Sequence, residues 1–383
     1  MKLAILKERR ASELRVAATP ETVKKFVGLG FEVTIEAGAG LSSQIPDQLY
    51  ADMGATVAAS AADAVKGADV VLKVQRPLRK GEGELDELAL LKPGMLLIGA
   101  LAPYADTDAV KAYAEAGITA CSLELLPRIT RAQSMDILSS QSNLSGYRAV
   151  IDAAYEFRRG MPMLMTAAGT VAPARVMVLG AGVAGLQAIA TAKRMGAIVS
   201  ATDVRPAAKE EVESLGGKFV MVESEETATA QTEGGYAKEM SDDYKRKQAE
   251  LVAETLKKQD IAICTALIPG KKAPTLISKE MVHSMKPGSV IIDLAVEQGG
   301  NCELAKVGEV VEVKGVKIVG HVNVPSRVAT DSSSLYAKNL LNFITPMIDK
   351  ESQQLKIDWE DEIISAVTLT RDGKVVNPAM QGS

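Results

Sequence analysis

Residues 175–185, RVMVLGAGVAG, constrain the fold of this 383-residue chain more than any other stretch. An apolar run of strand length leads into glycines at 180, 182 and 185, and a helix-forming segment follows. A GxGxxG spacing at a strand-to-helix turn is typical of a βαβ unit that binds a dinucleotide. We expect Gly180 to permit the tight turn, Gly182 to admit the pyrophosphate, and Gly185 to allow close helix–strand packing.

The next apolar run, AIVSATD, ends at Asp203, 18 residues after Gly185. An acidic side chain at the end of the second strand accepts hydrogen bonds from the adenosine ribose. Its charge also disfavours a 2′-phosphate, so the sequence predicts NAD(H) and not NADP(H). Arg205 argues against this selectivity, because an arginine can accommodate the phosphate. A glycine turn in an ordinary core sheet is the alternative interpretation.

Short apolar strands alternate with amphipathic helices in two regions of the chain. The first region runs from KLAILKE to ITACSLELL, and the second begins near residue 174. This alternation is typical of right-handed βαβ units and parallel sheets. The predicted fold is α/β, with two Rossmann-like, doubly wound domains, mainly parallel sheets and a cleft between them.

The predicted domain boundaries follow this alternation. We expect a first α/β domain at 1–126, completed by about 345–383, a linking loop and helix at 127–160, an NAD(H)-binding domain at 161–330 and a returning helix at 331–350. Near the C-terminus, LTRDGKVVN predicts a hairpin that turns at Asp372 and Gly373.

The acidic, weakly periodic segment 223–243 predicts a mobile lid, with a surface loop as the alternative.

Composition excludes several classes of protein. The net charge of −4 offers no basic surface for nucleic acid. Two histidines are too few for a typical zinc enzyme, and three scattered cysteines fit a reducing compartment. The N-terminus has no signal-peptide pattern, and no apolar run approaches 18 residues. We therefore do not expect the chain to span a membrane itself.

The polar segment 127–140, PRITRAQSMDILSS, precedes the glycine fingerprint. It contains an amide, guanidinium groups and a carboxylate, but no histidine, cysteine or lysine to relay a proton. The three-residue spacing of Gln133, Asp136 and Ser139 predicts one shared helical face. Thr130 and Gln133 also fit a capping box, which would give Gln133 a purely structural role.

Four stretches carry a resemblance to a known family: KERRASELRVAATP, VLKVQRP, the glycine fingerprint and GSVIIDLAVEQGG. They resemble the alanine dehydrogenase and nicotinamide nucleotide transhydrogenase superfamily, over nearly the whole chain. The dehydrogenase branch implies substrate-binding cations at Arg15 and Lys73, which are also open to interpretation as surface cations. It further implies a histidine where this chain has MLLIGALAPYAD, and an aspartate where it has Glu297. The substrate pocket of that branch is therefore incomplete.

The stretch RITRAQSMD resembles the loop that holds NAD(H) in the transhydrogenase branch. The resemblance implies that Arg128, Gln133, Asp136 and Ser139 are the catalytic, nicotinamide-site residues. No metal is expected. The implied cofactor-binding residues are Arg128, Ile129, Thr130, Gln133, Gly180, Gly182, Val183, Gly185, Asp203, Val204, Arg205, Gly235, Tyr236 and Leu267. Hydride transfer between two nicotinamides needs alignment and no proton relay at the reacting carbons, which agrees with the composition of the segment.

The resemblance implies the NAD(H)-binding subunit of a Si/Re-specific, proton-translocating NAD(P) transhydrogenase, active only with its partner subunits. The implied partners are an NADP(H)-binding component, a membrane-spanning component that couples hydride transfer to proton translocation, and a second copy in a homodimer. The chain would be cytoplasmic and peripheral on the inner membrane. Because it ends at Ser383, we expect a separate bacterial-type subunit or a fragment. An alanine-type amino-acid dehydrogenase and a non-catalytic NAD-binding module are the alternatives.

Overall fold

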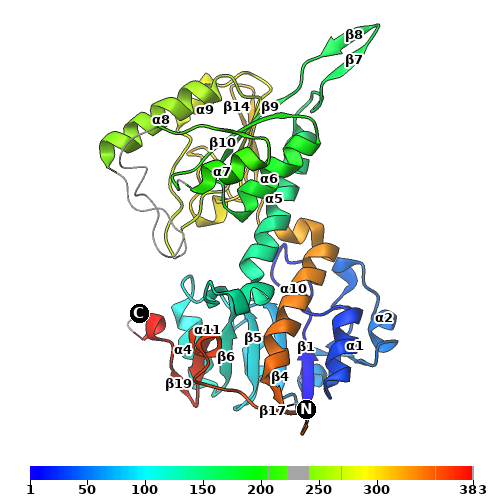
Figure 1. Cartoon of the computed structure of the whole chain (residues 1–383). Coiled ribbons are helices and arrows are strands. Elements are labelled where there is room, and N and C mark those ends of the chain that lie inside the picture. The colour runs from blue at the N-terminus through cyan, green and yellow to red at the C-terminus, as the bar shows by residue number, and fades with distance from the viewer. Residues whose placement is uncertain (206, 223–240, 269, 350, 382–383) are drawn as a thin grey trace. The chain divides into compact units, whose positions relative to one another are not determined.

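A computed structural model describes residues 1–205, 207–222, 241–268, 270–349 and 351–381. The chain forms two compact units, coloured along the chain in Figure 1. Unit 1 comprises Met1–Gln141 and Ser326–Ser383, and unit 2 comprises Ser142–Pro325. The predicted lid residues Gly235 and Tyr236 lie outside the described residues.

Unit 1 is built on an eight-stranded sheet with the order β19-β18-β6-β5-β4-β1-β2-β3. Its strands are β1 (Lys2–Ile5), β2 (Glu32–Glu36), β3 (Thr56–Ala58), β4 (Val70–Gln75), β5 (Leu96–Ala100), β6 (Thr119–Ser122), β18 (Thr368–Arg371) and β19 (Lys374–Val375). Strands β1 to β6 pair in parallel, whereas β18 is antiparallel to β6 and β19. The chain reverses its direction of winding between β1 and β4, so the sheet is doubly wound.

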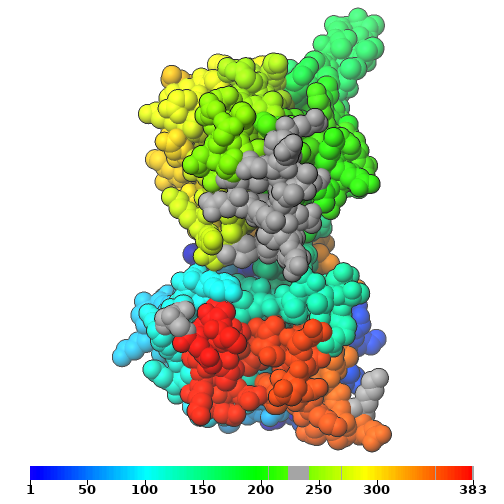
Figure 2. All heavy atoms as spheres, turned by 60° about the vertical axis from the view of Figure 1, so that its left-hand side comes forward, coloured from blue at the N-terminus to red at the C-terminus, as the bar shows by residue number. Residues whose placement is uncertain are grey.

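Helices cover both faces of this sheet. The helices are α1 (Pro20–Gly28), α2 (Asp47–Ala51), α3 (Ala61–Ala64), α4 (Thr107–Glu115), α10 (Ala329–Ile344) and α11 (Glu362–Val367). One core cluster joins α1, α2, α10 and α11 to the sheet, and another joins α3 and α4 to its opposite face. The C-terminal part of the chain, orange to red in Figure 2, forms an outer face of unit 1.

Two predictions for the C-terminal part have different outcomes. The hairpin is confirmed, because Arg371 pairs with Lys374 across a turn in which Asp372 and Gly373 have φ of 52° and 72°. The returning helix predicted at 331–350 is wrong at its end. It stops at Ile344, because Pro346 has no amide hydrogen to continue the ladder. A short antiparallel pair follows, β16 (Ile348–Asp349) with β17 (Gln354–Leu355).

Unit 2 contains a seven-stranded sheet with the order β11-β10-β9-β12-β13-β15-β14. Its strands are β9 (Arg175–Leu179), β10 (Ile198–Thr202), β11 (Lys218–Phe219), β12 (Ile261–Cys264), β13 (Val290–Asp293), β14 (Val310–Val313) and β15 (Val316–Val319). All neighbours are parallel except β14 and β15. The winding direction reverses between β9 and β12, and ligands of such sheets bind at the carboxyl ends of the strands at this point.

Helices also cover both faces of the second sheet. The helices are α5 (Ile137–Glu156), α6 (Val183–Arg194), α7 (Ala207–Ser214), α8 (Asp242–Leu256) and α9 (Lys279–Ser284). α5, α6 and α7 pack on one face, and α8 and α9 on the other. Burial of both faces explains the continuous apolar runs of the strands. The predicted α/β class, with two doubly wound and mainly parallel sheets, is confirmed.

A small hairpin of unit 2 was not expected from the sequence. It consists of β7 (Leu164–Thr166) and β8 (Gly169–Val171), and Figure 1 shows it projecting away from the rest of unit 2. Every residue of both strands is exposed. Over the part of the chain that the structure describes, no helix is both long and apolar enough to cross a bilayer.

Candidate functional site

The glycine fingerprint lies at the carboxyl end of β9, where the winding of the second sheet reverses. Gly180 has φ of +101°, which only glycine adopts without strain. A Cβ at Gly185 would lie 1.9 Å from the carbonyl oxygen of Gly180, so a larger residue cannot fit. A Cβ at Gly182 would meet no atom of the described residues within 4 Å. Open space therefore adjoins the amino end of α6, where backbone amides and the helix dipole favour an anion.

A glycine that was not predicted from the sequence packs against the same turn. A Cβ at Gly146, in the interior of α5, would lie 2.0 Å from the carbonyl oxygen of Ala184. The first turn of α6 can reach its position only because α5 has no side chain there. In the sequence, a glycine within a helical segment does not indicate which residue of another helix it will contact.

Asp203 lies just after β10, and its carboxylate is tied to the glycine turn. One carboxylate oxygen, Oδ2, accepts a hydrogen bond from the amide of Ala181 at 2.7 Å. The guanidinium of Arg205 donates to both carboxylate oxygens, at 3.0 and 3.2 Å, and to the carbonyl oxygen of Ala181 at 2.9 Å. Arg205 is thus paired with Asp203, so a 2′-phosphate at Arg205 would also meet a carboxylate. Val204 packs on Tyr244 of α8.

The segment after β12 lies against the opposite side of the turn. The hydroxyl of Thr265 donates to the carbonyl oxygen of Gly180 at 2.8 Å. Leu267 follows with an exposed side chain, as does Val183 at the start of α6. Two exposed apolar side chains beside a polar turn are suited to cover an aromatic ring of a ligand.

Gln248 on α8 was also not predicted from the sequence. Its amide donates to the hydroxyl of Thr202 at 2.7 Å and accepts from the amide of Val222 at 3.0 Å. It therefore holds the end of β10 immediately before Asp203. Neither Gln248 nor Thr265 belongs to a recognisable motif, so only the fold reveals their positions.

The polar segment 127–140 belongs mainly to unit 1 and folds as a 3-10 helix, η4 (Thr130–Met135). Ala132 and Met135 are buried in the core, whereas Gln133 is exposed. The predicted capping box is wrong. Ile129 occupies the N-cap position, and no side chain caps this helix, because Thr130 already lies inside it. The side chain of Gln133 forms no hydrogen bond to any residue that the structure describes.

The predicted single helical face for Gln133, Asp136 and Ser139 is also wrong. Asp136 interrupts the helix with an extended backbone, with φ of −70° and ψ of 97°. Its carboxylate accepts from the amide and the hydroxyl of Ser139, at 2.9 and 2.5 Å, and so caps α5. Asp136 and Ser139 hold each other and set the direction in which α5 begins. Arg128 and Thr130 are exposed, and Ile129 is half-buried.

Contacts within unit 1 fix the turn that carries Gln133. The amides of Asn339 and Asn342, both on α10, donate to the carbonyl oxygen of Ser134 at 2.9 Å each. Arg131 forms ion pairs with Asp361 at 2.8 Å and with Glu362 on α11. The turn is therefore held from two sides, and the amide of Gln133 projects from a fixed backbone.

The cations Arg15 and Lys73 are buried, so the interpretation as surface cations is wrong. The guanidinium of Arg15 binds both carboxylate oxygens of Glu13, at 2.8 and 2.7 Å. Burial raises the pKa of Glu13, but the hydrogen-bonded guanidinium outweighs burial and lowers it to about 2. Lys73 pairs with Glu87 at 3.0 Å and with Glu8 at 3.2 Å. Both cations are thus bound to carboxylates of the chain itself.

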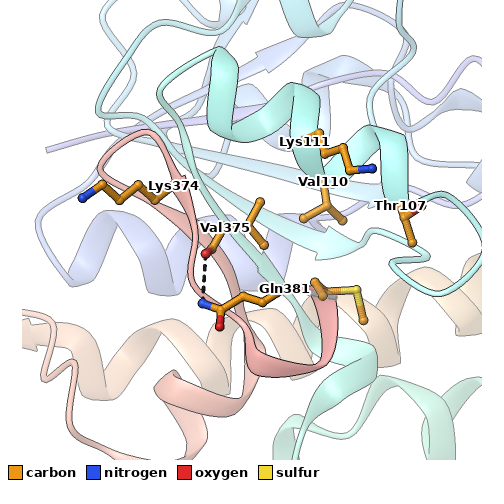
Figure 3. A pocket seen from close by; sticks show the side chains of 7 residues that line it. Thr107, Val110, Lys111, Lys374, Val375 and Gln381 are labelled. Atoms are coloured by element: carbon orange, nitrogen blue, oxygen red, sulfur yellow. Dashed lines mark hydrogen bonds between the residues drawn. The ribbon is translucent and has the colours of Figure 1, made fainter. Parts of the chain in front are cut away.

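Two cavities of about 550 Å³ each lie away from the residues described above. The first, shown in Figure 3, is lined by Thr107, Val110, Lys111, Lys374, Val375, Met380 and Gln381. The second lies at the amino ends of β9, β10 and β11. Neither contains a residue predicted to bind the cofactor. Among the described residues, no group of three or more histidine, cysteine or acidic side chains is placed to hold a metal ion.

Comparisons with known proteins agree with the resemblance noted in the sequence. The alanine dehydrogenase/PNT N-terminal domain matches residues 4–145, and the C-terminal domain of the same family matches residues 149–378. An NAD(P) transhydrogenase alpha-subunit chain of Rhodospirillum rubrum is 62% identical over 382 residues, covering 100% of this chain and 99% of the relative.

Solved structures extend the comparison. A crystal structure of transhydrogenase from Sinorhizobium meliloti has a TM-score of 0.88 at 54% identity, covering 98% of this chain and 100% of that chain. A structure of L-alanine dehydrogenase has a TM-score of 0.83 at 26% identity, covering 100% of this chain and 98% of that chain. The chain described here therefore belongs to the alanine dehydrogenase/PNT family.

Proposed function

We propose that this chain is the NAD(H)-binding subunit of a proton-translocating NAD(P) transhydrogenase, and that it transfers hydride between its NAD(H) and NADP(H) on a partner component. The observation that carries the proposal is the full-length similarity to a transhydrogenase subunit, which far exceeds the similarity to alanine dehydrogenase. The proposal includes a separate membrane-spanning component, through which the chain is peripheral on the inner membrane. The test is hydride transfer from NADH to an NADP⁺ analogue, with and without the partner components.

Unit 2 has residues suited to hold NAD(H). The open space beside Gly182, at the amino end of α6, fits a pyrophosphate. Asp203, with Val204 and Arg205, lies where a doubly wound sheet binds the adenosine ribose. The exposed side chains of Val183 and Leu267 are proposed to supply apolar contacts to an aromatic ring of the bound cofactor. The proposed roles of Gly235 and Tyr236 rest on the resemblance alone.

The segment around Gln133 is proposed to act on the nicotinamide. Bound NADH supplies the hydride, and the reacting atoms must be held about 3–3.5 Å apart. An amide and a guanidinium orient polar groups without transferring protons, so Gln133 and Arg128 are proposed to contact the cofactor, together with Ile129 and Thr130. Because Asp136 and Ser139 bind each other, their proposed role is to position this segment.

The alternative of an amino-acid dehydrogenase is disfavoured by the state of the two cations. Arg15 and Lys73 already hold Glu13, Glu8 and Glu87, so neither is available to a substrate carboxylate without breaking a buried ion pair. Glu297, which this chain has where the dehydrogenase branch has an aspartate, accepts a hydrogen bond from the backbone amide of Asn323 at 2.9 Å. An alanine-type dehydrogenase would oxidise NADH with pyruvate and ammonia, and we expect no such activity from the isolated chain.

Replacement of Asp203 by asparagine tests the ribose contact. A hydrogen bond to a charged acceptor contributes about 1.5–3 kcal/mol, so we expect NADH affinity to fall by about 10-fold or more. Selectivity against NADPH should also fall, because the carboxylate that repels the 2′-phosphate is lost. Calorimetric titration with both nucleotides measures the two effects. Equal affinities for NADH and NADPH in the unmodified chain would contradict the assignment.

Asp260→Asn is the matched control for that substitution. Asp260 is also bound by a backbone amide, that of Arg175 at 2.9 Å, and by the guanidinium of Arg159. It lies before β12, at the amino edge of the sheet, where the proposal places no nucleotide. We expect the asparagine variant to bind NADH and NADPH as the unmodified chain does.

We further propose that the β7–β8 hairpin is an arm of a homodimer. The hairpin exposes Met163, Leu164, Met165 and Val171, and Tyr155 at the adjoining end of α5 is 85% exposed. Contiguous exposed apolar side chains mark interfaces, and a two-stranded hairpin is at best marginally stable by itself in water. A second copy of the chain is the proposed occupant, since twofold dimers are the commonest assemblies.

Replacement of Met165 by glutamate should weaken this dimer. Glutamate at a central interface position removes an apolar contact and places a charge there, which costs about 2 kcal/mol or more, so we expect the dimer dissociation constant to rise by at least about 30-fold. Sedimentation equilibrium of the full chain measures it. Val307→Glu, at another exposed apolar residue of unit 2, is the control and should leave the dimer intact. A Met165→Glu chain with the unmodified dimer constant would exclude the hairpin from the interface.

A further inference from the structure

A buried asparagine of unit 2, Asn301, binds both backbone groups of one residue beside the glycine turn. Its side-chain oxygen accepts from the amide of Ala266 at 3.0 Å, and its side-chain nitrogen donates to the carbonyl oxygen of Ala266 at 2.9 Å. The same nitrogen donates to the carbonyl oxygen of Pro274 at 2.8 Å. Asn301 is fully buried, so water does not compete for these bonds.

The end of β13 fixes the position of Asn301. The carboxylate of Asp293 accepts from the backbone amides of Asn301 and Cys302 at 2.8 Å each, and from that of Ala295 at 2.9 Å. Burial raises the pKa of Asp293, and the three amides oppose this shift. Gly300 has φ of +77°, so the chain bends sharply around the carboxylate. The asparagine amide is therefore held on a rigid, buried support.

The residue that Asn301 binds lies against the fingerprint. Thr265, its chain neighbour, donates to the carbonyl oxygen of Gly180 at 2.8 Å, and a Cβ at Gly180 would lie 3.1 Å from the amide nitrogen of Ala266. This segment follows β12, the first strand of the second half of the doubly wound sheet. The first half, which contains Asp203, serves the adenosine nucleotide, and the second half serves the other nucleotide.

We infer that Asn301 is a positioning residue that holds Ala266 and Leu267 against the nicotinamide half of bound NAD(H). The inference rests on the proposed function, because it presupposes NAD(H) at the glycine turn. Replacement of Asn301 by aspartate keeps the shape of the side chain and removes its donor. An oxygen then faces the carbonyl oxygens of Ala266 and Pro274, which repel it, so the segment after β12 must move.

The test compares the affinities of Asn301→Asp and the unmodified chain for NADH and for ADP by calorimetric titration. ADP contains the adenosine and pyrophosphate groups and has no nicotinamide. We expect NADH affinity to fall about 10-fold, as the loss of buried hydrogen bonds predicts, and ADP affinity to change by less than about 2-fold. Unchanged NADH affinity, or an equal loss for both ligands, would overturn the inference. An unmodified chain that binds no NADH would instead overturn the proposed function.

Asn377→Asp is the matched control. Asn377 is a buried asparagine of unit 1 whose amide also accepts from a backbone nitrogen, that of Ala379, and donates to a backbone carbonyl, that of Ala366. We expect Asn377→Asp to leave the affinities for NADH and ADP unchanged. A loss of NADH affinity without a loss of ADP affinity in this control variant would contradict the inference. Asn301→Ser, which removes both bonds to Ala266 without adding a charge, replaces the aspartate variant if that protein does not fold. Failure of both variants to fold would assign Asn301 to the stability of unit 2 and overturn the inference.

Discussion

We expect Gln133→Asn to lower the rate of single-turnover hydride transfer about 100-fold in a complex reconstituted with the partner components. Asparagine retains the amide and shortens the side chain by one methylene, so the amide no longer reaches the same position. NADH affinity should stay within about 2-fold of the unmodified value, because most of it is proposed to come from the glycine turn and Asp203. Stopped-flow measurement of transfer, with NADH titrated in parallel, separates the two quantities.

The structure sharpens this prediction. Asn339 and Asn342 hold the carbonyl oxygen of Ser134, so the backbone at residue 133 stays in place when the side chain is shortened. Because Gln133 caps no helix, a loss of helix stability cannot account for a slower rate. Gln48→Asn, at an exposed glutamine of α2, is the control and should transfer hydride normally. An unchanged transfer rate in Gln133→Asn would mean that Gln133 has no role in hydride transfer. A loss of rate matched by an equal loss of NADH affinity would mean that Gln133 only contributes to NADH binding.

Alanine at Gly182 and at Gly185 should have different effects, although the two glycines are three residues apart. At Gly182 the backbone has φ of −73° and ψ of −167°, which alanine adopts readily, and the added methyl enters open space. We expect normal thermal stability and a loss of NADH affinity of about 100-fold, because the methyl occupies the place proposed for the pyrophosphate.

At Gly185 the added methyl meets backbone instead. It would lie 1.9 Å from the oxygen and 2.8 Å from the carbonyl carbon of Gly180, and neither atom can move without opening the turn. We expect unit 2 to lose about 2–3 kcal/mol of stability and the chain to lose NADH binding. Thermal unfolding and calorimetric titration measure both effects. Gly28→Ala, where a Cβ meets no atom within 4 Å in the part of the chain that the structure describes, is the control. Normal NADH affinity in Gly182→Ala would show that the pyrophosphate does not bind at this turn.

Local patterns were enough to predict the fold class. The alternation of strands and helices, the glycine spacing at 180, 182 and 185, and the Asp-Gly turn at 372–373 each specify backbone geometry within a few residues. The structure has that geometry at each of them. Such features depend on local conformation and on burial of apolar side chains, both of which can be read from a short stretch of sequence.

Two local predictions failed. The capping box at Thr130 failed because Ile129 takes the N-cap position, and the shared helical face failed because Asp136 caps a new helix. Contacts between distant residues could not be predicted at all. Lys73 pairs with Glu8 and Glu87, Arg15 binds Gln141 in addition to its near neighbour Glu13, and Asn301 meets Ala266 only through the folded sheet. No spacing along the chain encodes these contacts, because they depend on which strands become neighbours.

The most direct measurement of the proposed function is reconstituted hydride transfer. NADH bound to the full chain is mixed with an NADP⁺ analogue, in the presence and absence of the NADP(H)-binding component, and transfer is followed by absorbance. We predict rapid transfer only when the partner component is present, and no NADH oxidation by pyruvate and ammonia in its absence. NADH oxidation by pyruvate and ammonia, with no transfer to the analogue when the partner is added, would contradict the account.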